Sequence, residues 1–198
     1  MKLPVLLANR KLSNFRLFLY RFASKRDYYV IEHGNIRNTK EPLVRIHSAC
    51  SFATVFNSQR CDCEAQLQLA LRKISNSVAG LLIYAWAHEG RAVGMWNHVR
   101  VYMEQDKGED TVSSYEVLGL PVDSRDYTDA ISILKAYKIS RVKLLTNNPK
   151  KVESLENSGI KVVRTPLIAK LTKYNQSQMK VKIKKLGHYF DEVTRNSI

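Results

Sequence analysis

A continuous apolar run from Gly80 to Trp86 is the feature that most limits the fold of this chain. It has the length of a strand and carries no charge, which is typical of a strand buried on both faces of a sheet. The run ends in a polar, glycine-containing turn from His88 to Arg91. Because α/β folds place ligand sites where buried strands end in loops, we predict an α/β protein with a site near this turn. The alternative interpretation is a plain turn between a strand and a helix.

The remaining pattern predicts further strands and helices on both sides of this run. Strands are expected at residues 14–22, 28–31, 42–47, 142–146 and 161–164, and helices after Cys63, around residues 99–103, at 128–138 and at 149–158. Val99, Tyr102 and Met103 share one helical face, a pattern usual for core packing, and residues 168–193 form a basic, partly helical segment. The chain contains no repeat or linker. We therefore predict one compact domain over residues 1–198, of mixed α/β class, with a central mixed sheet flanked by helices.

All three cysteines lie close together in the chain, at Cys50, Cys61 and Cys63. Thiolates are strong zinc ligands, and structural zinc sites usually have four protein ligands. Three cysteines leave one coordination position for water, as in catalytic zinc sites, where the pKa of the bound water falls to about 7. The alternative is three unrelated buried thiols, since free cysteine packs as a small hydrophobic residue. Arg60 and Asp62 beside the pair make a poor setting for core packing.

A second candidate site lies at the start of the helix that begins near Pro149. Asn147 and Asn148 are good helix caps, and proline at the first helical position loses nothing by lacking an N–H. Thr146 and Lys151 would then lie at a helix N-terminus, a natural phosphate site.

These motifs together resemble the GTP cyclohydrolase II family, the enzymes that open riboflavin biosynthesis. The resemblance rests on Arg45 to Cys50, Cys61 to Cys63, the turn from His88 to Arg91, and the blocks 100–111, 123–127, 144–151 and 187–188. It covers nearly the whole chain and implies a GTP cyclohydrolase II-like fold. The implied reaction is hydrolytic opening of the guanine imidazole ring of GTP. It releases formate and diphosphate and leaves 2,5-diamino-6-(5-phosphoribosylamino)pyrimidin-4(3H)-one.

The resemblance also implies roles for individual residues. Cys50, Cys61 and Cys63 would hold one catalytic Zn²⁺, and Mg²⁺ would accompany the triphosphate. Tyr102 would donate or relay a proton, Asp123 would accept one, and Arg125 would be the nucleophile for the α-phosphoryl group. Because a guanidinium stays protonated, an electrostatic clamp is the simpler role for Arg125.

The expected substrate contacts are carried over by matching positions. Among them, Glu89 is suited to accept hydrogen bonds from the guanine base, and His47 is expected to line the substrate or position the backbone rather than bind zinc. The full set is Arg45, Ile46, His47, Ser48, Ala49, Gln66, Glu89, Gly90, Arg91, Thr111, Thr146 and Lys151.

The net charge of +14 first suggests a partner that is a polyanion, and the densest basic patch is Lys180 to Lys185. A triphosphate substrate also needs positive charge, and the lysines are spread along the chain. We therefore favour a nucleotide enzyme over a zinc-containing nucleic-acid-binding protein. A nucleotide sensor without activity is a third alternative, against which the intact zinc and catalytic residues argue.

The environment and assembly can also be anticipated. No apolar run approaches the roughly 20 residues of a membrane helix, and the stretch from Leu3 to Ala8 is too short for a signal-peptide core. Three clustered cysteines without a pairing pattern suit a reducing compartment. We predict a cytoplasmic protein without a membrane partner, and the family resemblance implies a homodimer.

Several positions depart from the family pattern. Ala49 stands where glutamate is usual, Ala53-Thr54 where Gly-Asp is usual, and Glu64 where glycine is usual. Trp86 to His88 replace Leu-Arg-Gln, and His98 replaces a common lysine. Because the ligands remain while pocket neighbours change, we also consider a divergent paralogue. Such a paralogue would form an altered product, take another purine nucleotide or serve a related specialised pathway.

Overall fold

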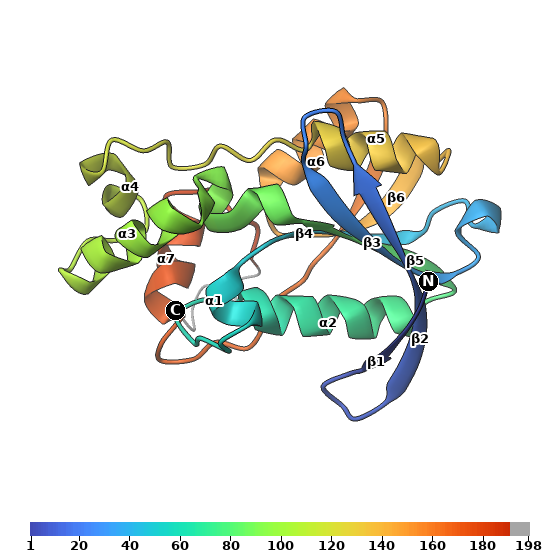
Figure 1. Cartoon of the computed structure of the whole chain (residues 1–198), viewed down its shortest axis with the longest axis horizontal. Helices are drawn as coiled ribbons and strands as arrows, with labels where there is room; N and C mark the ends of the chain where they lie inside the picture. The colour runs from blue at the N-terminus through green and yellow to red at the C-terminus, as the bar shows by residue number, and fades with distance from the viewer. Residues whose placement is uncertain (191–198) are drawn as a thin grey trace.

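The computed structural model describes residues 1–190, and all seven strands of this part join one sheet (Figure 1). Their order across the sheet is β1-β2-β3-β5-β4-β6-β7. The strands are β1 (Lys2–Leu6), β2 (Leu12–Arg21), β3 (Asp27–Gly34), β4 (Leu43–Ser48), β5 (Ala79–Ala85), β6 (Arg141–Leu145) and β7 (Lys161–Thr165).

The sheet is mixed, and β5 is the strand at which its character changes. Strands β1, β2, β3 and β5 are antiparallel neighbours, whereas β5, β4, β6 and β7 run parallel. Ile83 of β5 pairs with Val30 of β3 on one side and with Ile46 of β4 on the other. Every residue of β5 is buried, which confirms the strand predicted from the apolar run. Parallel connections need covering helices, so the centre of the sheet is covered on both faces.

Seven α-helices and two short 3₁₀ segments, η1 and η2, lie among these strands in the part described. They are η1 (Ile36–Asn38), α1 (Ser51–Thr54), α2 (Cys63–Ser75), η2 (Trp86–Ala92), α3 (Gly94–Asp106), α4 (Ser113–Val117), α5 (Thr128–Ala136), α6 (Pro149–Asn157) and α7 (Gln176–Lys184).

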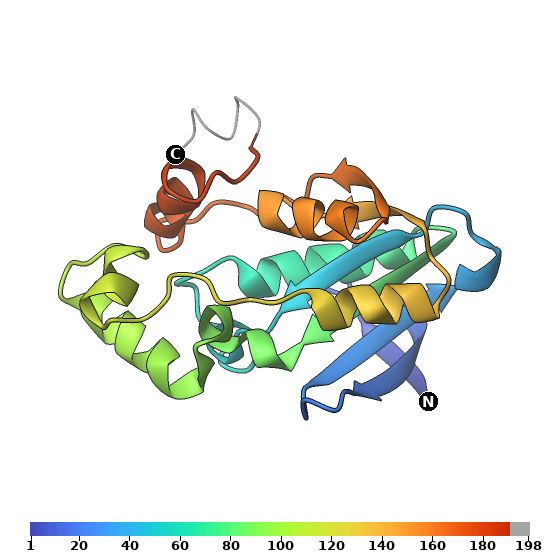
Figure 2. The ribbon, with the colours of Figure 1, turned by 90° about the horizontal axis from the view of Figure 1, so that it is seen from above.

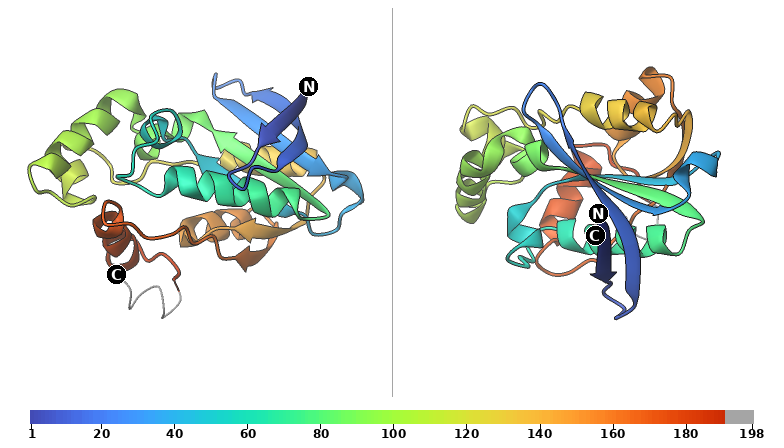
Figure 3. Two further views of the ribbon diagram at one scale, coloured as in Figure 1. Left: turned by 90° about the horizontal axis from the view of Figure 1, so that it is seen from below. Right: turned by 45° about the vertical axis from the view of Figure 1, so that its right-hand side comes forward.

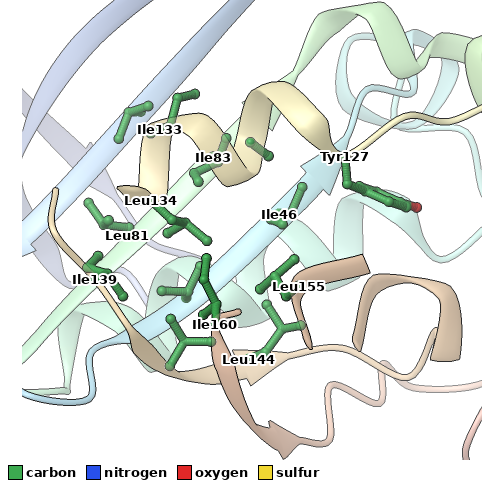
Figure 4. Packing of buried hydrophobic residues seen from close by; sticks show 14 of the residues in the cluster. Ile46, Leu81, Ile83, Tyr127, Ile133, Leu134, Ile139, Leu144, Leu155 and Ile160 are labelled. Atoms are coloured by element: carbon green, nitrogen blue, oxygen red, sulfur yellow. The ribbon is translucent and has the colours of Figure 1, made fainter. Parts of the chain in front are cut away.

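The alternation of side chains along β5 divides the core into two layers. Leu81 and Ile83 pack against α5 in one hydrophobic cluster (Figure 4). Leu82 and Tyr84 point the other way and pack against α2. Figures 1 and 3 show α5 and α2 on opposite sides of the sheet. The predicted α/β class, with helices flanking a central mixed sheet, is confirmed.

Helices α3, α4 and α7 gather at one end of the molecule, beyond the carboxyl end of β4 (Figures 1 and 2). The predicted site near the turn from His88 to Arg91 lies in this region.

One strand was not predicted, and one local expectation was wrong. The apolar stretch near the N-terminus is the edge strand β1, paired with β2. On α3, Val99 and Met103 are exposed, whereas His98 and Val101 are buried. The buried side of α3 faces a polar cavity rather than an apolar core, so hydrophobic spacing pointed to the wrong face.

The C-terminal expectation is met in part. Helix α7 occupies nine residues of the segment predicted at 168–193, and residues 191–193 lie outside the described part of the chain. Within residues 1–190, none of the helices combines the length and the apolar character needed to cross a membrane.

Candidate active site

A cavity opens at the carboxyl ends of β4, β5 and β6, where the parallel strands give way to loops. Most of the predicted site residues line it, namely Arg45, His47, Ser48, Ala49, Cys50, Cys61, Cys63, Gln66, Gly90, Arg91, Tyr102, Thr111, Arg125, Thr146 and Lys151. The predicted residues that do not line it are Ile46, Glu89 and Asp123. Strands adjacent in the sheet thus bring together residues that are distant in the sequence.

The three cysteine sulfurs converge on one side of this cavity. Cys50 follows β4, whereas Cys61 and Cys63 lie at the start of α2, and all three Sγ atoms lie within 4.8 Å of one another. The Sγ atoms of Cys50 and Cys61 are 3.7 Å apart. A tetrahedral zinc with Zn–S bonds of about 2.3 Å requires S···S edges of about 3.8 Å, so the cluster fits a zinc ion.

One of the three cysteines, Cys61, forms a thiolate readily, whereas the hydrogen bonds among the three sulfurs and burial raise the pKa of Cys50 and Cys63. Hydrogen bonds from the thiols of Cys50 and Cys63 lower the pKa of Cys61 to about 3, despite its burial. The thiolate is the form that binds metal. All three cysteines are free rather than disulfide-bonded.

Glu89 and His98 lie near the cluster but are already paired. Their ligand atoms are within 4.8 Å of each other and of the Cys50 sulfur. The carboxylate of Glu89 accepts hydrogen bonds from His98 Nδ1 at 2.6 Å and from both the amide and the hydroxyl of Ser51. Burial would raise the pKa of Glu89, but these hydrogen bonds outweigh it and lower the pKa. The carboxylate is thus held in place from inside the protein, and it anchors the first residue of α1.

The turn that carries Glu89 has a strained path. Gly90 has a φ of +58°, and a Cβ there would lie 2.8 Å from the Cβ of His98, so only glycine fits without a shift. Arg91 is also left-handed, with a φ of +60°. Its guanidinium lies over the ring of Tyr115, 5.6 Å from the centroid. The turn therefore places one cation at the cavity wall.

Asp62 lies between two of the cysteines and organises a buried polar network that the sequence did not reveal. Its carboxylate accepts hydrogen bonds from Lys182 Nζ at 2.5 Å and from Gln66 Nε2 at 2.6 Å. Gln66 in turn accepts from Arg45 Nη2 at 2.5 Å. Burial alone would raise the pKa of Asp62, but the charge of Lys182 lowers it. Lys182 belongs to the basic patch noted in the sequence and is the member of that patch that points inward.

Tyr102 lies beside the cysteine cluster. Its ring centroid is 4.8 Å from that of His98 and 5.2 Å from that of Phe52, and the Arg60 guanidinium lies 4.5 Å from the ring centroid. Burial and the nearby Cys61 raise the pKa of Tyr102, so the phenol stays protonated. It is available as a proton donor.

Asp123 and Arg125 form a bidentate ion pair, of which Arg125 lines the cavity. Arg125 Nε and Nη2 donate to the two carboxylate oxygens of Asp123 at 2.8 and 2.6 Å. Burial would raise the pKa of Asp123, but Arg125 outweighs it and brings the pKa to about 2. Burial would lower the pKa of Arg125, but the bonds to Asp123 raise it. Both groups are therefore ionised at neutral pH.

Thr146 and Lys151 lie close to the cavity floor. Lys151 is buried, and its Nζ donates to the carbonyl of Ile46 at 2.8 Å. Burial, followed by the charges of Arg45 and Arg125, lowers the pKa of Lys151 well below its usual value. Since several positive groups crowd together here, a bound anion would relieve their repulsion.

The start of α6 is built as predicted. Asn148 caps it by accepting from the amide of Lys150 at 2.9 Å, and Pro149 is the first helical residue. The amide of Asn148 donates to the Thr146 hydroxyl at 3.0 Å. Phosphate binding at this helix end stays a prediction.

Besides His47, three histidines line the cavity. His88 and His98 occupy positions where the sequence departs from the family pattern, and His188 comes from the segment after α7. Burial lowers the pKa of His88 to about 4 and that of His188 to about 3, so both are neutral at pH 7. His47 is also buried, stacks on Tyr84, and has no hydrogen-bond partner at either ring nitrogen within the described chain.

This chain is similar to a known family of proteins. The family model described as GTP cyclohydrolase II matches residues 5–166. A protein named GTP cyclohydrolase-2 from Picrophilus torridus is 39% identical over 181 residues, covering 91% of this chain and 94% of the relative. Another of that name from Helicobacter pylori is 43% identical, covering 82% of each chain. The riboflavin biosynthesis protein RibBA of Aquifex aeolicus is 40% identical, but this chain spans only 44% of it. A match of this extent, over the segment that carries the cysteines and the ion pair, places the chain in the GTP cyclohydrolase II family.

Proposed function

We propose that this protein is a zinc-dependent GTP cyclohydrolase II, acting as one catalytic domain. It opens the imidazole ring of GTP, releases C8 as formate, releases diphosphate, and yields 2,5-diamino-6-(5-phosphoribosylamino)pyrimidin-4(3H)-one for riboflavin biosynthesis. The observation that carries the proposal is the convergence on one cavity of three cysteine residues and of Arg125, which is paired with Asp123. The first group suits hydrolysis of the base and the second suits phosphoryl chemistry.

The cysteine cluster would hold the metal. A zinc ion held by Cys50, Cys61 and Cys63 would supply Lewis acidity and would activate water at neutral pH. Its fit is supported by the S···S distance of 3.7 Å between Cys50 and Cys61. Tyr102, kept protonated by burial, donates a proton to the purine as the ring opens.

The positive groups of the cavity bind the triphosphate together with Mg²⁺. Arg91, Arg125 and Lys151 line the cavity. Arg125 is held rigidly by Asp123 and cannot lose its proton, so it acts as a clamp on the α-phosphoryl group. Thr146 and Lys151 lie at the start of α6 and are suited to the outer phosphates.

The guanine base is bound near the turn from His88 to Arg91. Glu89 has both carboxylate oxygens engaged by Ser51 and His98. A purine that uses Glu89 as an acceptor therefore has to share it with these donors. Gln66 and Thr111 provide further polar groups on the cavity wall.

An altered product is the second candidate, because three departures from the family pattern line the cavity, at Ala49, His88 and His98. Changes so close to the reacting base could redirect the ring-opened intermediate or change the purine that is accepted.

An exposed apolar surface supports a homodimer. Met95, Trp96, Val99 and Met103 of α3 are 63%, 79%, 41% and 54% exposed. An apolar helix face of this size normally packs against another protein surface. We propose that a second copy of the chain covers it.

Three free, clustered cysteines also support a reducing, cytoplasmic location.

The test is product analysis with purified, zinc-loaded protein, GTP and Mg²⁺. Mass spectrometry should show loss of the C8 carbon as formate together with release of diphosphate. A ring-opened product that keeps the formyl group would support the altered-product alternative. Turnover of another purine but not of GTP would change the substrate, and binding of RNA or DNA without turnover of any nucleotide would overturn the proposal. A Cys63→Ser variant is the matched inactive control.

A further inference from the structure

A second cavity lies at the end of the molecule opposite the catalytic one. It is lined by β2, by β3 and the loop through η1, and by the turn that joins α5 to β6. Strands β6 and β7 begin here, whereas the catalytic cavity lies where the parallel strands end. Figures 1 and 2 show the η1 segment (light blue) at the opposite end of the molecule from α3 and α4. Within residues 1–190 the two cavities share no lining residue, so this one, the η1 cavity, is separate from the catalytic site.

The wall of the η1 cavity is strongly basic. Glu32 is the one acidic residue among the described residues that line it, and the cations are Arg16, Arg37, Lys40, Lys138, Arg141 and Lys161. Arg16 is paired with Glu32, and Arg141 is paired with Glu41. The other four cations are exposed and have no acidic partner within residues 1–190. Like charges around one cavity repel one another, and a bound polyanion would relieve this repulsion.

Aromatic side chains line the same cavity. Arg16, Phe18 and Tyr20 alternate along β2 and therefore point to one face of the sheet. Phe18, Tyr20 and Tyr137 are half-buried, because they pack on the core and also line the cavity. Glu32, which is only 4% exposed, accepts hydrogen bonds from Arg16 and, at 3.1 Å, from the Tyr137 hydroxyl. The buried carboxylate thus ties β2 to the end of α5 and fixes one cation and one ring in the cavity wall.

The size of the η1 cavity, its charge and its rings together define a ligand. Its volume of about 1400 Å³ exceeds the roughly 300–1,000 Å³ of small-molecule sites, so an extended ligand suits it better than a single nucleotide. Unpaired, exposed cations suit a chain of phosphates, and half-buried rings suit flat bases that are free to stack. A duplex hides its bases, an acidic peptide makes no use of the rings, and a second copy of this chain would add positive charge.

We propose that the η1 cavity binds a single-stranded nucleic acid, independently of the reaction at the cysteine cluster. The phosphate contacts are Arg37, Lys40, Lys138 and Lys161, and the stacking surfaces are Phe18, Tyr20 and Tyr137. Binding is largely independent of base sequence, because every base offers a flat face for stacking. This second activity gives a use to part of the net charge of +14 that lies away from the catalytic cavity.

Fluorescence anisotropy measures binding of a labelled, mixed-sequence strand of about 20 nucleotides, longer than the usual site of roughly 4–16 nucleotides. Neutralisation of four phosphates predicts a slope of about −2.8 for log K against log[KCl], which is a loss of about 50-fold between about 50 and 200 mM. RNA and DNA of the same sequence are the two arms, and salt-dependent binding of either supports the proposal and identifies the preferred strand. Equal affinity for a duplex, or equal competition by polyglutamate of matched charge, would overturn it.

Charge variants locate the binding surface. Arg37→Gln combined with Lys138→Gln should reduce the salt slope by about 1.4 and weaken binding about tenfold or more at about 0.1 M KCl. Lys180→Gln combined with Lys184→Gln, at two exposed lysines of α7, makes the same change in net charge and should weaken binding less than about twofold. Equal losses in the two double variants would overturn the proposal. Arg91→Gln should leave the affinity unchanged, and a loss there would place the strand in the catalytic cavity instead.

Ring variants test the stacking. Phe18→Leu and Tyr20→Leu keep the apolar packing, and each should weaken binding about fivefold or more with the salt slope unchanged. Tyr174→Leu, at a position 61% exposed outside the η1 cavity, is the control. Wild-type affinity in both ring variants, folded by circular dichroism, would overturn the proposal. Normal GTP turnover without strand binding defeats only this inference, whereas strand binding without turnover of any nucleotide defeats only the proposed function.

Discussion

Lys182 of α7 donates a hydrogen bond of 2.5 Å to the carboxylate of Asp62, which stands between Cys61 and Cys63. The Lys182 side chain is only 13% exposed and that of Asp62 only 2%. The pair joins the C-terminal helix to the loop that carries two of the proposed metal ligands. Helix α7 lies beyond residues 5–166, the part matched by the family model, so the cavity depends on chain outside that match.

Replacing Lys182 by methionine should therefore weaken zinc binding. The carboxylate of Asp62 would lose its main partner, and the cysteine loop would lose an outer contact of the kind that typically changes metal affinity 10- to 100-fold. Competition with a chromophoric chelator measures the affinity. Lys180→Met, on the exposed side of the same helix, is the control. Equal affinities in the two variants would contradict the prediction.

Replacing Arg125 by lysine should slow diphosphate release by about 10²-fold. Lysine keeps the charge but cannot make the two parallel bonds to Asp123 that position the head group. Steady-state release of diphosphate is the measurement, with Arg141→Lys at an exposed ion pair as control. If diphosphate release slowed equally in Arg125→Lys and Arg141→Lys, the bidentate geometry at Asp123 would not be the cause.

Buried His88 should make the protein less stable as the pH falls. Its pKa is about 4 in the folded protein, below the usual value near 6.5, so the unfolded chain binds the proton more tightly. The stabilisation is complete above about pH 6.5 and is lost as the pH falls toward 4. Between pH 8 and pH 5 this amounts to about 2 kcal/mol.

Urea unfolding of wild type and His88→Gln at both pH values, with EDTA present, measures this effect. The free energy of unfolding of the variant should fall by about 2 kcal/mol less than that of the wild type. If the free energy of unfolding falls equally in wild type and variant, His88 is not the group that titrates.

Removing the Ile83 side chain should destabilise the fold strongly. Ile83 is fully buried between β3, β4 and α5 (Figure 4), and an Ile→Ala change in such a place costs about 3 kcal/mol. Denaturant unfolding gives the value. Val78→Ala, at a position 87% exposed, should change the free energy of unfolding by less than about 0.5 kcal/mol.

Replacing Trp96 by glutamate should convert a dimer into a monomer. Trp96 is 79% exposed within an apolar face of α3, and a charge there would oppose burial against a second copy. Light scattering after size-exclusion chromatography reports the mass. Val78→Glu is the control at another exposed apolar position. A wild-type protein that is monomeric at micromolar concentration would contradict the prediction.

Most of the strands and the clustering of the cysteines could be predicted because their signals are local. The uncharged run that became β5 can be satisfied only by burial on both faces, and three cysteines within fourteen residues have few other uses. The Asn148 cap with Pro149 follows from backbone chemistry alone. In each case, neighbouring residues in the chain contain the physical reason.

Tertiary structure decided the partners of these residues. No local pattern shows that Lys182 turns inward to Asp62, 120 residues away, while Lys180 and Lys184 on α7 are exposed. The apolar spacing of α3 pointed to Val99 and Met103 as the buried side, yet His98 is buried because it faces Glu89. Ser48 meets His88 only because β4 and β5 are adjacent and in that register. The sequence by itself determined which chemical groups are present and which segments must be buried. The packing of the sheet and its helices determined which of those groups meet, since contacts between distant residues depend on strand order and helix placement.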